Sequence, residues 1–463
     1  MWVKAYSNIA FWIGLFFLVH LIGIYHPPIE AAHSWRQATG LMVARNYFEG
    51  NTSFFFPMVD ETNGGIGIIG MEFPILYYLQ GKLAHLFGFH VAIGRLINVI
   101  ISSVGVGYFY ALIRRFAIEK TAFYATLLLM ISCFFMYSRK VMPDTEAIAF
   151  YVIGIYYYFN ALSRGSWKDI GLAFFFLSLG LLVKIAVLPL LAMVVFSYVY
   201  FRNKPKKSLV FFLPFIALVP AFLWYFAWNP YLAATYGNWY NIGGDLSDGA
   251  QALMESPLKL LEQVFFHPFF SYLVWGVLFF GLYKVFSKGL TLALSLSLAL
   301  FIILFAAYAL KSGTIFISHE YYILPLVPVL AVFGGYGLAH LGKYAWICSV
   351  LIALEALGNQ AHDFRYNHNE SYKLTLTTIG RKYIPTNALV AINGNINPQE
   401  LYFLGRKGWN LSDELLCNKE QQHALKAKGC AFWIVNKHTM RCSMPEGKVL
   451  VESKDYLLIK GIK

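Results

Sequence analysis

The stretch His26-Pro27-Pro28-Ile29-Glu30-Ala31-Ala32-His33-Ser34-Trp35-Arg36-Gln37 follows directly on an apolar run from Tyr6 to Tyr25. It opens the first large polar segment of a chain that is 58% hydrophobic and 13% charged. The two prolines end the preceding helix, because proline lacks the backbone N–H that a helix interior needs. We interpret the segment out to about Phe89 as an outer loop with reactive side chains, held by a membrane-embedded frame.

The composition indicates a polytopic helical membrane protein. Soluble domains are about a quarter charged, and this chain has runs near the roughly 20 apolar residues that cross a bilayer. The runs are continuous rather than alternating, which excludes a membrane β-barrel. Lys4 precedes the first run and no small-residue cleavage site follows it, so it is expected to be a retained span. About eleven spans are expected, near 6–25, 93–113, 119–137, 146–162, 168–184, 186–201, 208–227, 268–286, 290–310, 322–341 and 344–358.

Basic residues between these runs indicate the orientation. Lys and Arg concentrate in cytoplasmic loops, so the net charge of +13 reflects topology and no nucleic-acid partner is expected. The loops 26–90, 138–145, 228–267 and 311–321 then face outward. A turn near Lys184 between two short spans keeps the flanking clusters on one side. The clusters comprise Arg114, Arg115, Lys120, Arg164, Lys168, Arg202, Lys204, Lys206, Lys207, Lys284, Lys288 and Lys343.

The membrane part, 1–358, precedes a tail, 359–463, that reads as a small extracytoplasmic α/β domain. Short β-rich runs occur at 388–392, 431–435 and 448–451, and a helical stretch, 420–428, ends at Gly429. Two of the five cysteines lie in expected spans. The other three, Cys417, Cys430 and Cys442, lie in the tail, where one pair could be bridged.

Within the first loop, two amphipathic stretches are expected to lie in the membrane interface. The first runs from Ser34 to Phe48 and the second from Pro74 to near Gly88. A glycine-rich turn, 64–70, separates them.

Glu30, His33 and Gln37 share one face if 29–40 is helical. Arg36 lies beside them. A carboxylate here could act as a general base on an acceptor hydroxyl or amine, with His33 sharing or tuning that role. The alternative is a polar interfacial helix with no chemistry.

Asp60 and Glu72 are two further candidate acids, each flanked by apolar residues. They are candidates for the base or for orienting a substrate. The alternative is that they cap turns or pair with Arg36 or Arg95.

Cations in outward loops break the topology pattern. Arg139 and Lys140 lie between two expected spans with Asp144, and Lys184 lies at an outer hairpin tip. An arginine suits a phosphate group, whereas snorkelling to the headgroups is the alternative for Lys184. Polar residues also gather at the outer mouth of a later span, where an aromatic belt is the ordinary explanation; they are His319, Glu320, Tyr321 and Tyr322.

Several motifs are absent from the sequence. It has no P-loop, no paired Cys-x-x-Cys zinc site and no His-Glu-x-x-His. A nucleotide-driven pump is therefore disfavoured. No metal is predicted, although paired acids could hold a divalent cation.

The chain resembles the GT-C superfamily of integral-membrane glycosyltransferases, nearest to the protein O-mannosyltransferase and aminoarabinose-transferase branches. The resemblance covers roughly 1–358 and rests on the order of its motifs along the chain. A single span leads into a long outer loop with two interfacial helices. The motifs are Ala44-Arg45-Asn46-Tyr47-Phe48-Glu49-Gly50, Tyr137-Ser138-Arg139 with Met142-Pro143-Asp144, Leu182-Val183-Lys184, and His319-Glu320-Tyr321-Tyr322-Ile323-Leu324-Pro325.

The resemblance implies an inverting glycosyltransferase of the cytoplasmic membrane with an outward-facing site. Such enzymes move a sugar from a polyprenyl-phosphate donor to an extracytoplasmic acceptor, which can be a protein, lipid or glycan. Glu30 would be the base, with His33 nearby. The implied phosphate-side residues are Arg139, Lys184 and Tyr321 or Tyr322, with Asp144 and Glu72 as orienting groups.

One departure keeps the base open. The family's first-loop signature is an Asp-Glu pair shortly before the Ala-Arg segment, and the matching positions here are Arg36 and Gln37. The base therefore stays open among Glu30, His33, Asp60 and Glu72.

Two other functions remain as alternatives. A flippase or transporter of lipid-linked glycans would place ionisable residues mid-span and show inverted repeats, and we find no internal repeat. A glycan ligase or polymerase with a lipid-diphosphate donor shares the outward cations, and the sequence separates it poorly from the first hypothesis.

Overall fold

The computed structural model describes residues 8–30, 32–62, 64–201, 205–237, 243–289, 291–365, 367–440 and 445–461. Contacts divide the chain into two compact units. The first, here the membrane unit, comprises Met1–Ile24, Arg95–Ala227 and Asn241–Phe364. The second, here the loop unit, comprises Tyr25–Gly94, Trp228–Tyr240 and Arg365–Lys463.

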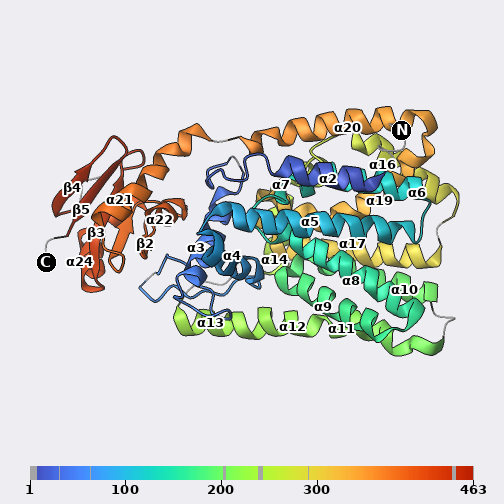
Figure 1. Cartoon of the computed structure of the whole chain (residues 1–463), viewed down its shortest axis with the longest axis horizontal. Helices are drawn as coiled ribbons and strands as arrows, with labels where there is room; N and C mark the ends of the chain where they lie inside the picture. Colours follow the sequence, from blue (N-terminus) through green and yellow to red (C-terminus); the bar gives the residue numbers. More distant parts are fainter. Residues whose placement is uncertain are drawn as a thin grey trace. The chain divides into compact units, whose positions relative to one another are not determined.

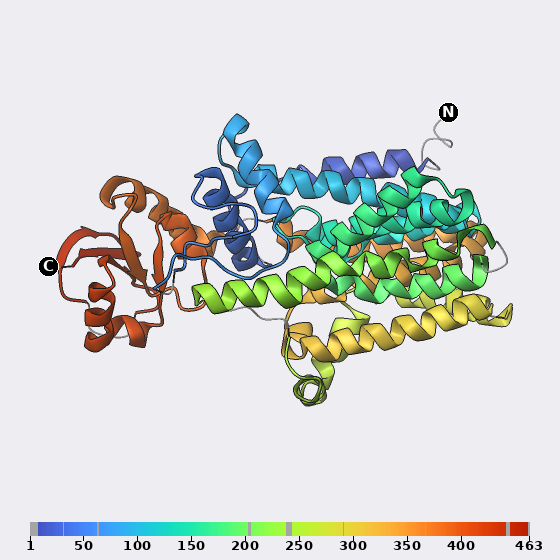
Figure 2. The same cartoon turned by 90° about the horizontal axis from the view of Figure 1, so that it is seen from below.

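Apolar helices that run alongside one another build the membrane unit (Figures 1 and 2). In the described part of the chain, four helices are long and apolar enough to cross a membrane, and three shorter apolar helices accompany them. This confirms a mainly helical membrane protein, and the count of eleven spans stays a prediction. The long helices are Val91–Arg114, Leu209–Tyr236, Leu292–Ser312 and Glu320–His340, and the shorter ones are Ile9–His20, Ile185–Phe201 and Val274–Ser287.

Small residues let neighbouring helices of this unit approach closely. α8 (Asp144–Arg164) packs on α9 (Trp167–Val183). A Cβ on Gly180 of α9 would lie 2.9 Å from the carbonyl oxygen of Ala147 in α8. In a membrane, helix association rests on such tight packing rather than on hydrophobicity. Substitutions at Gly180 would therefore push the two helices apart.

The expected hairpin turn at Lys184 is present. α9 ends at Val183, and Lys184 has extended backbone angles, φ −157° and ψ 116°. The chain then continues through η1 (Ile185–Ala192) into α10 (Met193–Phe201). The ring of Phe201 lies 6.0 Å from that of Phe159 near the end of α8. The chain therefore returns to its starting side, which places Lys184 at the tip.

Several expected span boundaries were wrong. The span expected at 119–137 is interrupted at Ser132, whose hydroxyl accepts a hydrogen bond from the backbone N–H of Phe134 and starts a new helix. The helix expected to end at 227 continues to Tyr236. Two helices lie in the expected loop 228–267, because their apolar residues recur at helical spacing. The elements concerned are α6 (Glu119–Ile131), α7 (Cys133–Tyr137), α13 (Asn229–Tyr236), α14 (Leu246–Glu255) and α15 (Pro257–Phe265).

The remaining helices of the membrane unit follow the expected order. The basic cluster Arg202, Lys204, Lys206 and Lys207 lies outside the residues whose side chains are described. The helices are α2 (Ile9–His20), α5 (Val91–Arg114), α11 (Leu213–Ile216), α12 (Leu218–Leu223), α16 (Val274–Ser287), α17 (Leu292–Ser312), α18 (Thr314–Ser318), η4 (Glu320–Leu326), α19 (Val327–His340), α20 (Ala345–Gln360) and η6 (Ala361–Phe364).

In the loop unit, both amphipathic stretches of the first loop form the expected helices. They are α3 (Ser34–Phe48) and α4 (Ile75–Phe87). The glycine-rich turn between them needs glycine at Gly67, where φ is +90° and a Cβ would lie 2.3 Å from the carbonyl oxygen of Val59. A small cluster of Met58, Ile68 and Leu232 packs the loop onto α13.

The tail forms a five-stranded sheet in the order β2-β1-β3-β5-β4. β1, β2 and β3 are parallel, and β5 is antiparallel to β3 and β4. The three expected strands and the helix before Gly429 are present, whereas the short β2 and the C-terminal β5 were missed. The strands are β1 (Leu389–Ile392), β2 (Gly408–Asn410), β3 (Cys430–Asn436), β4 (Lys448–Glu452) and β5 (Tyr456–Lys460).

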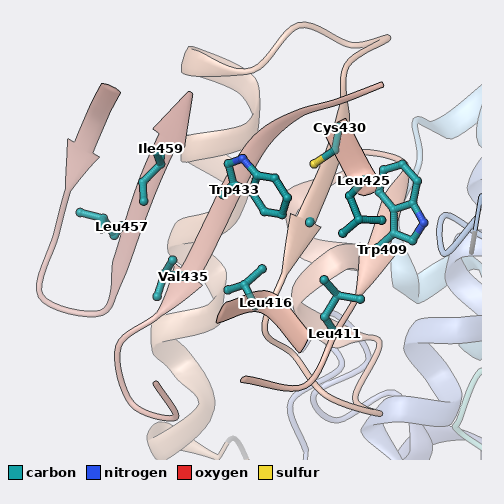
Figure 3. Packing of buried hydrophobic residues seen from close by; sticks show 10 residues of the cluster. Trp409, Leu411, Leu416, Leu425, Cys430, Trp433, Val435, Leu457 and Ile459 are labelled. Atoms are coloured by element: carbon teal, nitrogen blue, oxygen red, sulfur yellow. The ribbon is translucent and has the colours of Figure 1, made fainter. Parts of the chain in front are cut away.

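One face of this sheet is covered by a compact apolar core (Figure 3). Trp433 and Leu416 are fully buried, and Trp409 lies beside them. Both tryptophans therefore belong to the core of the tail. Cys417 is disulfide-bonded, whereas Cys430 is free. Cys442 lies outside the described residues. The helices of the tail are η7 (His368–Leu374), α21 (Thr375–Tyr383), α22 (Gln399–Leu404), α23 (Asp413–Cys417) and α24 (Lys419–Ala427).

Candidate functional site

Glu30 lies on the segment directly before α3 and is only 3% exposed. Its Oε2 accepts a hydrogen bond of 3.2 Å from Nε2 of Gln37, which is fully buried. The hydroxyl of Ser34 donates to the backbone carbonyl of Glu30. The first turn of α3 therefore contacts Glu30 twice, with Gln37 at the carboxylate and Ser34 at the backbone.

A continuous helix over 29–40, which was the condition for a common face of Glu30, His33 and Gln37, is not present. α3 begins at Ser34, and His33 adopts a left-handed conformation, φ 54° and ψ 31°. A non-glycine residue there costs about 1–3 kcal/mol and is typical of functional sites. The chain turns at His33, so Glu30 and His33 do not lie on one face of a helix with Gln37. Glu30 and Gln37 still meet, through the turn rather than through helical spacing.

Contacts within the loop unit determine where the segment before Glu30 lies. The side chain of Gln399 donates a hydrogen bond of 2.6 Å to the carbonyl oxygen of Pro28. The backbone N–H of Asn367 donates to the carbonyl oxygen of Ile29 at 3.2 Å. Both donors belong to the tail, which sequence spacing alone could not place beside the first loop.

Glu72 braces the two helices of the first loop. Its carboxylate forms an ion pair with Arg36 of α3, and the hydroxyl of Tyr77 in α4 donates to it at 2.7 Å. The ion pair between Glu72 and Arg36, which the sequence analysis gave as an alternative to a catalytic role, is therefore present.

Asp60 pairs with Arg45, which was not among the expected partners. Nδ2 of Asn46 donates to its other oxygen at 3.0 Å. Arg45 also donates to the carbonyl oxygen of Tyr402 at 2.9 Å, which joins α3 to the tail. Asp60 and Glu72 are each held by a guanidinium, whereas the acceptor-side role of Glu30 and His33 stays a prediction.

In the membrane unit, Lys184 lies in a small cluster of charged and aromatic side chains. Its ammonium forms an ion pair with Asp144. The same nitrogen lies 4.5 Å from the ring centre of Tyr321 and 5.3 Å from that of Tyr322. Four of the predicted substrate-binding residues are thus brought together.

Two features of this cluster indicate room for a ligand. An ammonium has three N–H donors, and Asp144 is the one hydrogen-bond acceptor that Lys184 has within the described ranges. Oδ2 of Asp144 is buried and accepts no hydrogen bond from the described residues. Buried polar atoms are nearly always paired, so each exception calls for an explanation such as a ligand.

Aromatic and polar neighbours hold the tyrosines in position. The hydroxyl of Tyr137 donates to Glu320 at 3.1 Å, and its ring lies 5.6 Å from that of Tyr321. His319 is adjacent, with its ring 5.5 Å from that of Tyr321. The residues of the 319–322 motif therefore act as one packed group.

Arg139 and Lys140 have a different set of partners. Arg139 is fully buried, donates to the carbonyl oxygen of Gly23 at 3.1 Å, and stacks on Phe364 at 4.3 Å. Lys140 forms a fully buried ion pair with Asp363 at 2.8 Å. These contacts tie the end of α7 to the ends of α2 and α20. The described contacts thus place Arg139 in a structural joint and give no direct support to its predicted phosphate role.

Among the residues that the structure describes, no group of three or more His, Cys, Asp or Glu side chains could hold a metal ion.

Comparisons with known proteins bear on this arrangement. The family model of dolichyl-phosphate-mannose-protein mannosyltransferases matches residues 72–228. The structure is similar to that of ArnT from Cupriavidus metallidurans bound to undecaprenyl phosphate, with a TM-score of 0.65 and 12% identity over 97% of this chain and 98% of that one. The chain has the GT-C fold. This confirms the resemblance seen in the sequence.

Other solved structures with the GT-C fold agree. The apo form of the same ArnT gives a TM-score of 0.64 at 12% identity over 97% of each chain. The oligosaccharyltransferase of Archaeoglobus fulgidus in complex with Zn and sulfate gives 0.59 at 12% identity, over 92% of this chain and 67% of that one. No curated protein sequence matches the chain.

The match to the family model covers Glu72, Arg139, Asp144 and Lys184, whereas Glu30 precedes it. Sequence reasoning considered Arg95 only as an ion-pair partner of Asp60 or Glu72, whereas it is fully buried and donates to the carbonyl oxygen of Ile24 at 3.2 Å. The available signal was the position of Arg95 inside the span expected at 93–113. Charged residues are rare within membrane spans and usually have a structural or functional role there.

Proposed function

We propose that the protein is an inverting membrane glycosyltransferase that moves a sugar from a polyprenyl-phosphate donor to an extracytoplasmic acceptor. The observation that carries the proposal is the cluster of Lys184, Asp144, Tyr321 and Tyr322. It combines a cation with unused donors, a buried acid with an unpaired oxygen, and two aromatic rings. The ArnT structure of the same fold, described as bound to undecaprenyl phosphate, supports a lipid-phosphate donor.

On the donor side, Lys184 would bind the phosphate. Its two remaining N–H groups can donate to phosphate oxygens, and charge-assisted hydrogen bonds of this type are about twice as strong as neutral ones. As the bond between the anomeric carbon and the phosphate oxygen breaks, negative charge develops on that oxygen. A fixed cation stabilises this charge without reorganisation. The polyprenyl phosphate leaves with the electron pair of the broken bond.

On the acceptor side, Glu30 would take the proton of the attacking hydroxyl or amine. The acceptor oxygen or nitrogen forms the new bond to the anomeric carbon from the face opposite the phosphate, which inverts the configuration. Glu30 is buried and oriented by Gln37, as a positioned general base should be.

The outward orientation rests on charge distribution and on the tail. Disulfide bonds persist in oxidising compartments, so the bond at Cys417 supports a tail outside the cytoplasm. The basic inter-span loops support the same orientation in the cytoplasmic membrane.

The lipid that copurifies with the protein tests the donor class. We expect mass spectrometry of the protein in mild detergent to detect a polyprenyl phosphate or its sugar adduct, increased when polyprenyl-phosphate sugars are added. A diphosphate-linked oligosaccharide instead would favour a ligase or a flippase. If the protein binds no isoprenoid even when it is supplied, the donor assignment is wrong.

A further inference from the structure

The tail contains a small cavity that the proposed reaction does not use. Its volume is about 240 Å³. Pockets for drug-sized ligands span roughly 300–1,000 Å³, so this one fits a smaller group. We call it the asparagine crevice, and its main lining residues are Tyr372, Asn393, Asn397, Glu400, Asp413 and Asn436.

The asparagine crevice lies where an open parallel sheet places ligands. Asn393 directly follows β1, and Asn436 is the last residue of β3. The order β2-β1-β3 means that the chain leaves β1 toward one side and that β3 lies on the other. Ligands of such sheets bind at the carboxyl ends of the strands, at the point where the connections diverge. The crevice occupies this point.

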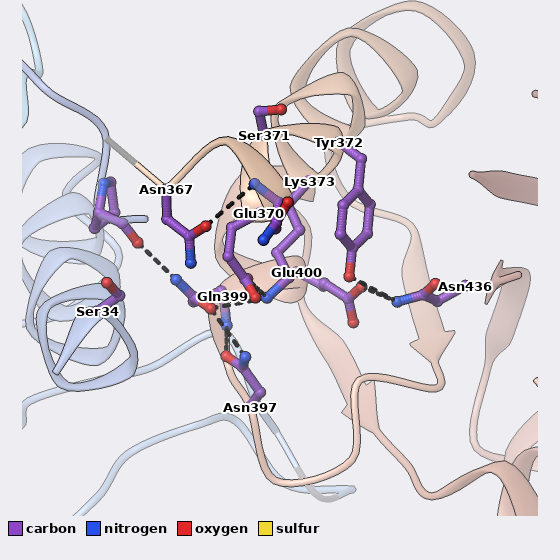
Figure 4. Close-up of polar contacts among 12 residues, drawn as sticks. Ser34, Asn367, Glu370, Ser371, Tyr372, Lys373, Asn397, Gln399, Glu400 and Asn436 are labelled. Carbon is purple, nitrogen blue, oxygen red and sulfur yellow. Dashed lines mark hydrogen bonds and ion pairs between the residues drawn. The ribbon is translucent and has the colours of Figure 1, made fainter. Parts of the chain in front are cut away.

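Glu400 has an oxygen available to a ligand. The side chain is 2% exposed, and its Oε1 accepts a hydrogen bond from Asn436 at 2.5 Å (Figure 4). The same oxygen accepts a hydrogen bond from Tyr456 at 2.8 Å. Its Oε2 accepts none from the residues that the structure describes. This oxygen faces Gly394, where a Cβ would lie only 2.8 Å away. A second acceptor beside it, Oδ1 of Asn410, is buried without a hydrogen-bond partner in the described part of the chain.

The charges in the asparagine crevice argue against an anionic ligand. Its cation, Lys373, forms an ion pair with Glu370 and donates to Gln399 at 3.0 Å. Two carboxyl groups, Glu400 and Asp413, line the same space. The unused atoms are acceptors, so the ligand should donate several hydrogen bonds and carry no negative charge. The hydroxyls of one sugar ring meet this requirement.

An aromatic wall completes the site. The ring of Tyr372 lines the crevice and is held between His438, at 4.5 Å, and Tyr456, at 5.8 Å. Tyrosine offers an apolar face with a polar end, which suits the C–H face and the hydroxyl edge of a sugar.

We propose that the asparagine crevice binds one uncharged sugar unit through Glu400 and Tyr372. We further infer that this sugar belongs to the acceptor of the transfer, a step that rests on the proposed function. A chain of hydrogen bonds supports it, since Lys373 in the crevice wall binds Gln399, and Gln399 binds the backbone of Pro28 ahead of Glu30 (Figure 4). A sugar held here would lie in the same unit as the candidate base.

The decisive variant is Glu400→Gln. Glutamine keeps the oxygen that accepts from Asn436 and Tyr456, and replaces the free oxygen by an NH₂ donor. The matched control is Glu420→Gln, an exposed acid on α24. Binding is measured by saturation-transfer NMR with the full chain in a detergent without sugar headgroups, against a panel of neutral monosaccharides.

We expect the unmodified chain and Glu420→Gln to bind the same sugar, and Glu400→Gln to bind it about tenfold more weakly or worse, because the bond to a charged acceptor is lost. Burial raises the pKa of Glu400. Affinity of the unmodified chain should therefore fall as pH drops through that raised pKa, while Glu400→Gln shows no such change. No binding of any sugar, equal binding by Glu400→Gln, or competition by inorganic phosphate would overturn the proposal.

A second measurement separates the acceptor inference from sugar binding. In a transfer assay, Glu400→Gln should raise the acceptor KM and leave the donor KM unchanged. If sugar binding is lost in this variant while both KM values stay unchanged, the crevice binds sugar but not the acceptor. An unchanged acceptor KM would therefore contradict the acceptor inference without contradicting the proposed polyprenyl-phosphate donor.

Discussion

Replacing Glu30 by Gln is expected to abolish sugar transfer while the protein stays folded. A positioned general base contributes about 10²–10⁴-fold to the rate, and an amide cannot take the acceptor proton. Glutamine has the same shape, and its oxygen can still accept from Gln37, the donor 3.2 Å away. We therefore expect kcat to fall by about two to four orders of magnitude, with the melting temperature in detergent little changed.

Glu49→Gln is the matched control for this variant. Glu49 is the exposed residue that follows α3, so its loss removes the same charge from the same loop. Its turnover should equal that of the unmodified chain. Normal turnover of Glu30→Gln would exclude Glu30 as the base, and Asp60→Asn and Glu72→Gln would then be the variants to assay.

Replacing Lys184 by Met is expected to impair both donor binding and stability. The variant leaves Asp144, with its side chain 3% exposed, as a buried charge without its partner. Breaking a buried pair from one side costs about 3–5 kcal/mol, although the 18% exposure of Lys184 places the loss at the lower end. The donor KM should rise by at least about tenfold, since each 1.4 kcal/mol of lost phosphate binding is a factor of ten.

The double variant Lys184→Met with Asp144→Asn separates the two effects. Removing both charges leaves no uncompensated charge, so the melting temperature should recover. Donor use should not recover, because the cation is still missing. If the double variant restores transfer together with stability, Lys184 is only a structural residue and the donor site must be sought elsewhere.

The sequence pattern predicted those helices, turns and strands whose formation depends only on the residues within them. The helix at Ser34–Phe48, the turn at Lys184 and the strands around Val390 and Ile434 follow from apolar spacing and from the residues that end them. The conformation of the segment before α3 could not be predicted in the same way. It depends on the left-handed His33 and on hydrogen bonds from the tail to the segment before Glu30.

The same limit applies to the candidate site. The motif around 319–322 and the outer position of Lys184 predicted that these residues are functional, and the structure brings them together with Asp144. Arg139 fits the same rule of an outward cation, and its contacts include the backbone carbonyl of Gly23 and the ring of Phe364, so its phosphate role stays a prediction. Sequence shows which charges are out of place for a membrane protein, whereas the identity of the partner is decided by packing between distant segments.

In the proposed reaction the sugar comes from a polyprenyl phosphate. To test this, the purified protein is supplied with a polyprenyl-phosphate sugar, radiolabelled in the sugar, together with an extract that contains acceptors. We expect the label to move to an acceptor and one polyprenyl phosphate to be released per sugar transferred, and we expect neither with Glu30→Gln. Transfer that requires a lipid diphosphate, or movement of the intact labelled lipid across the bilayer without release of phosphate, would contradict it.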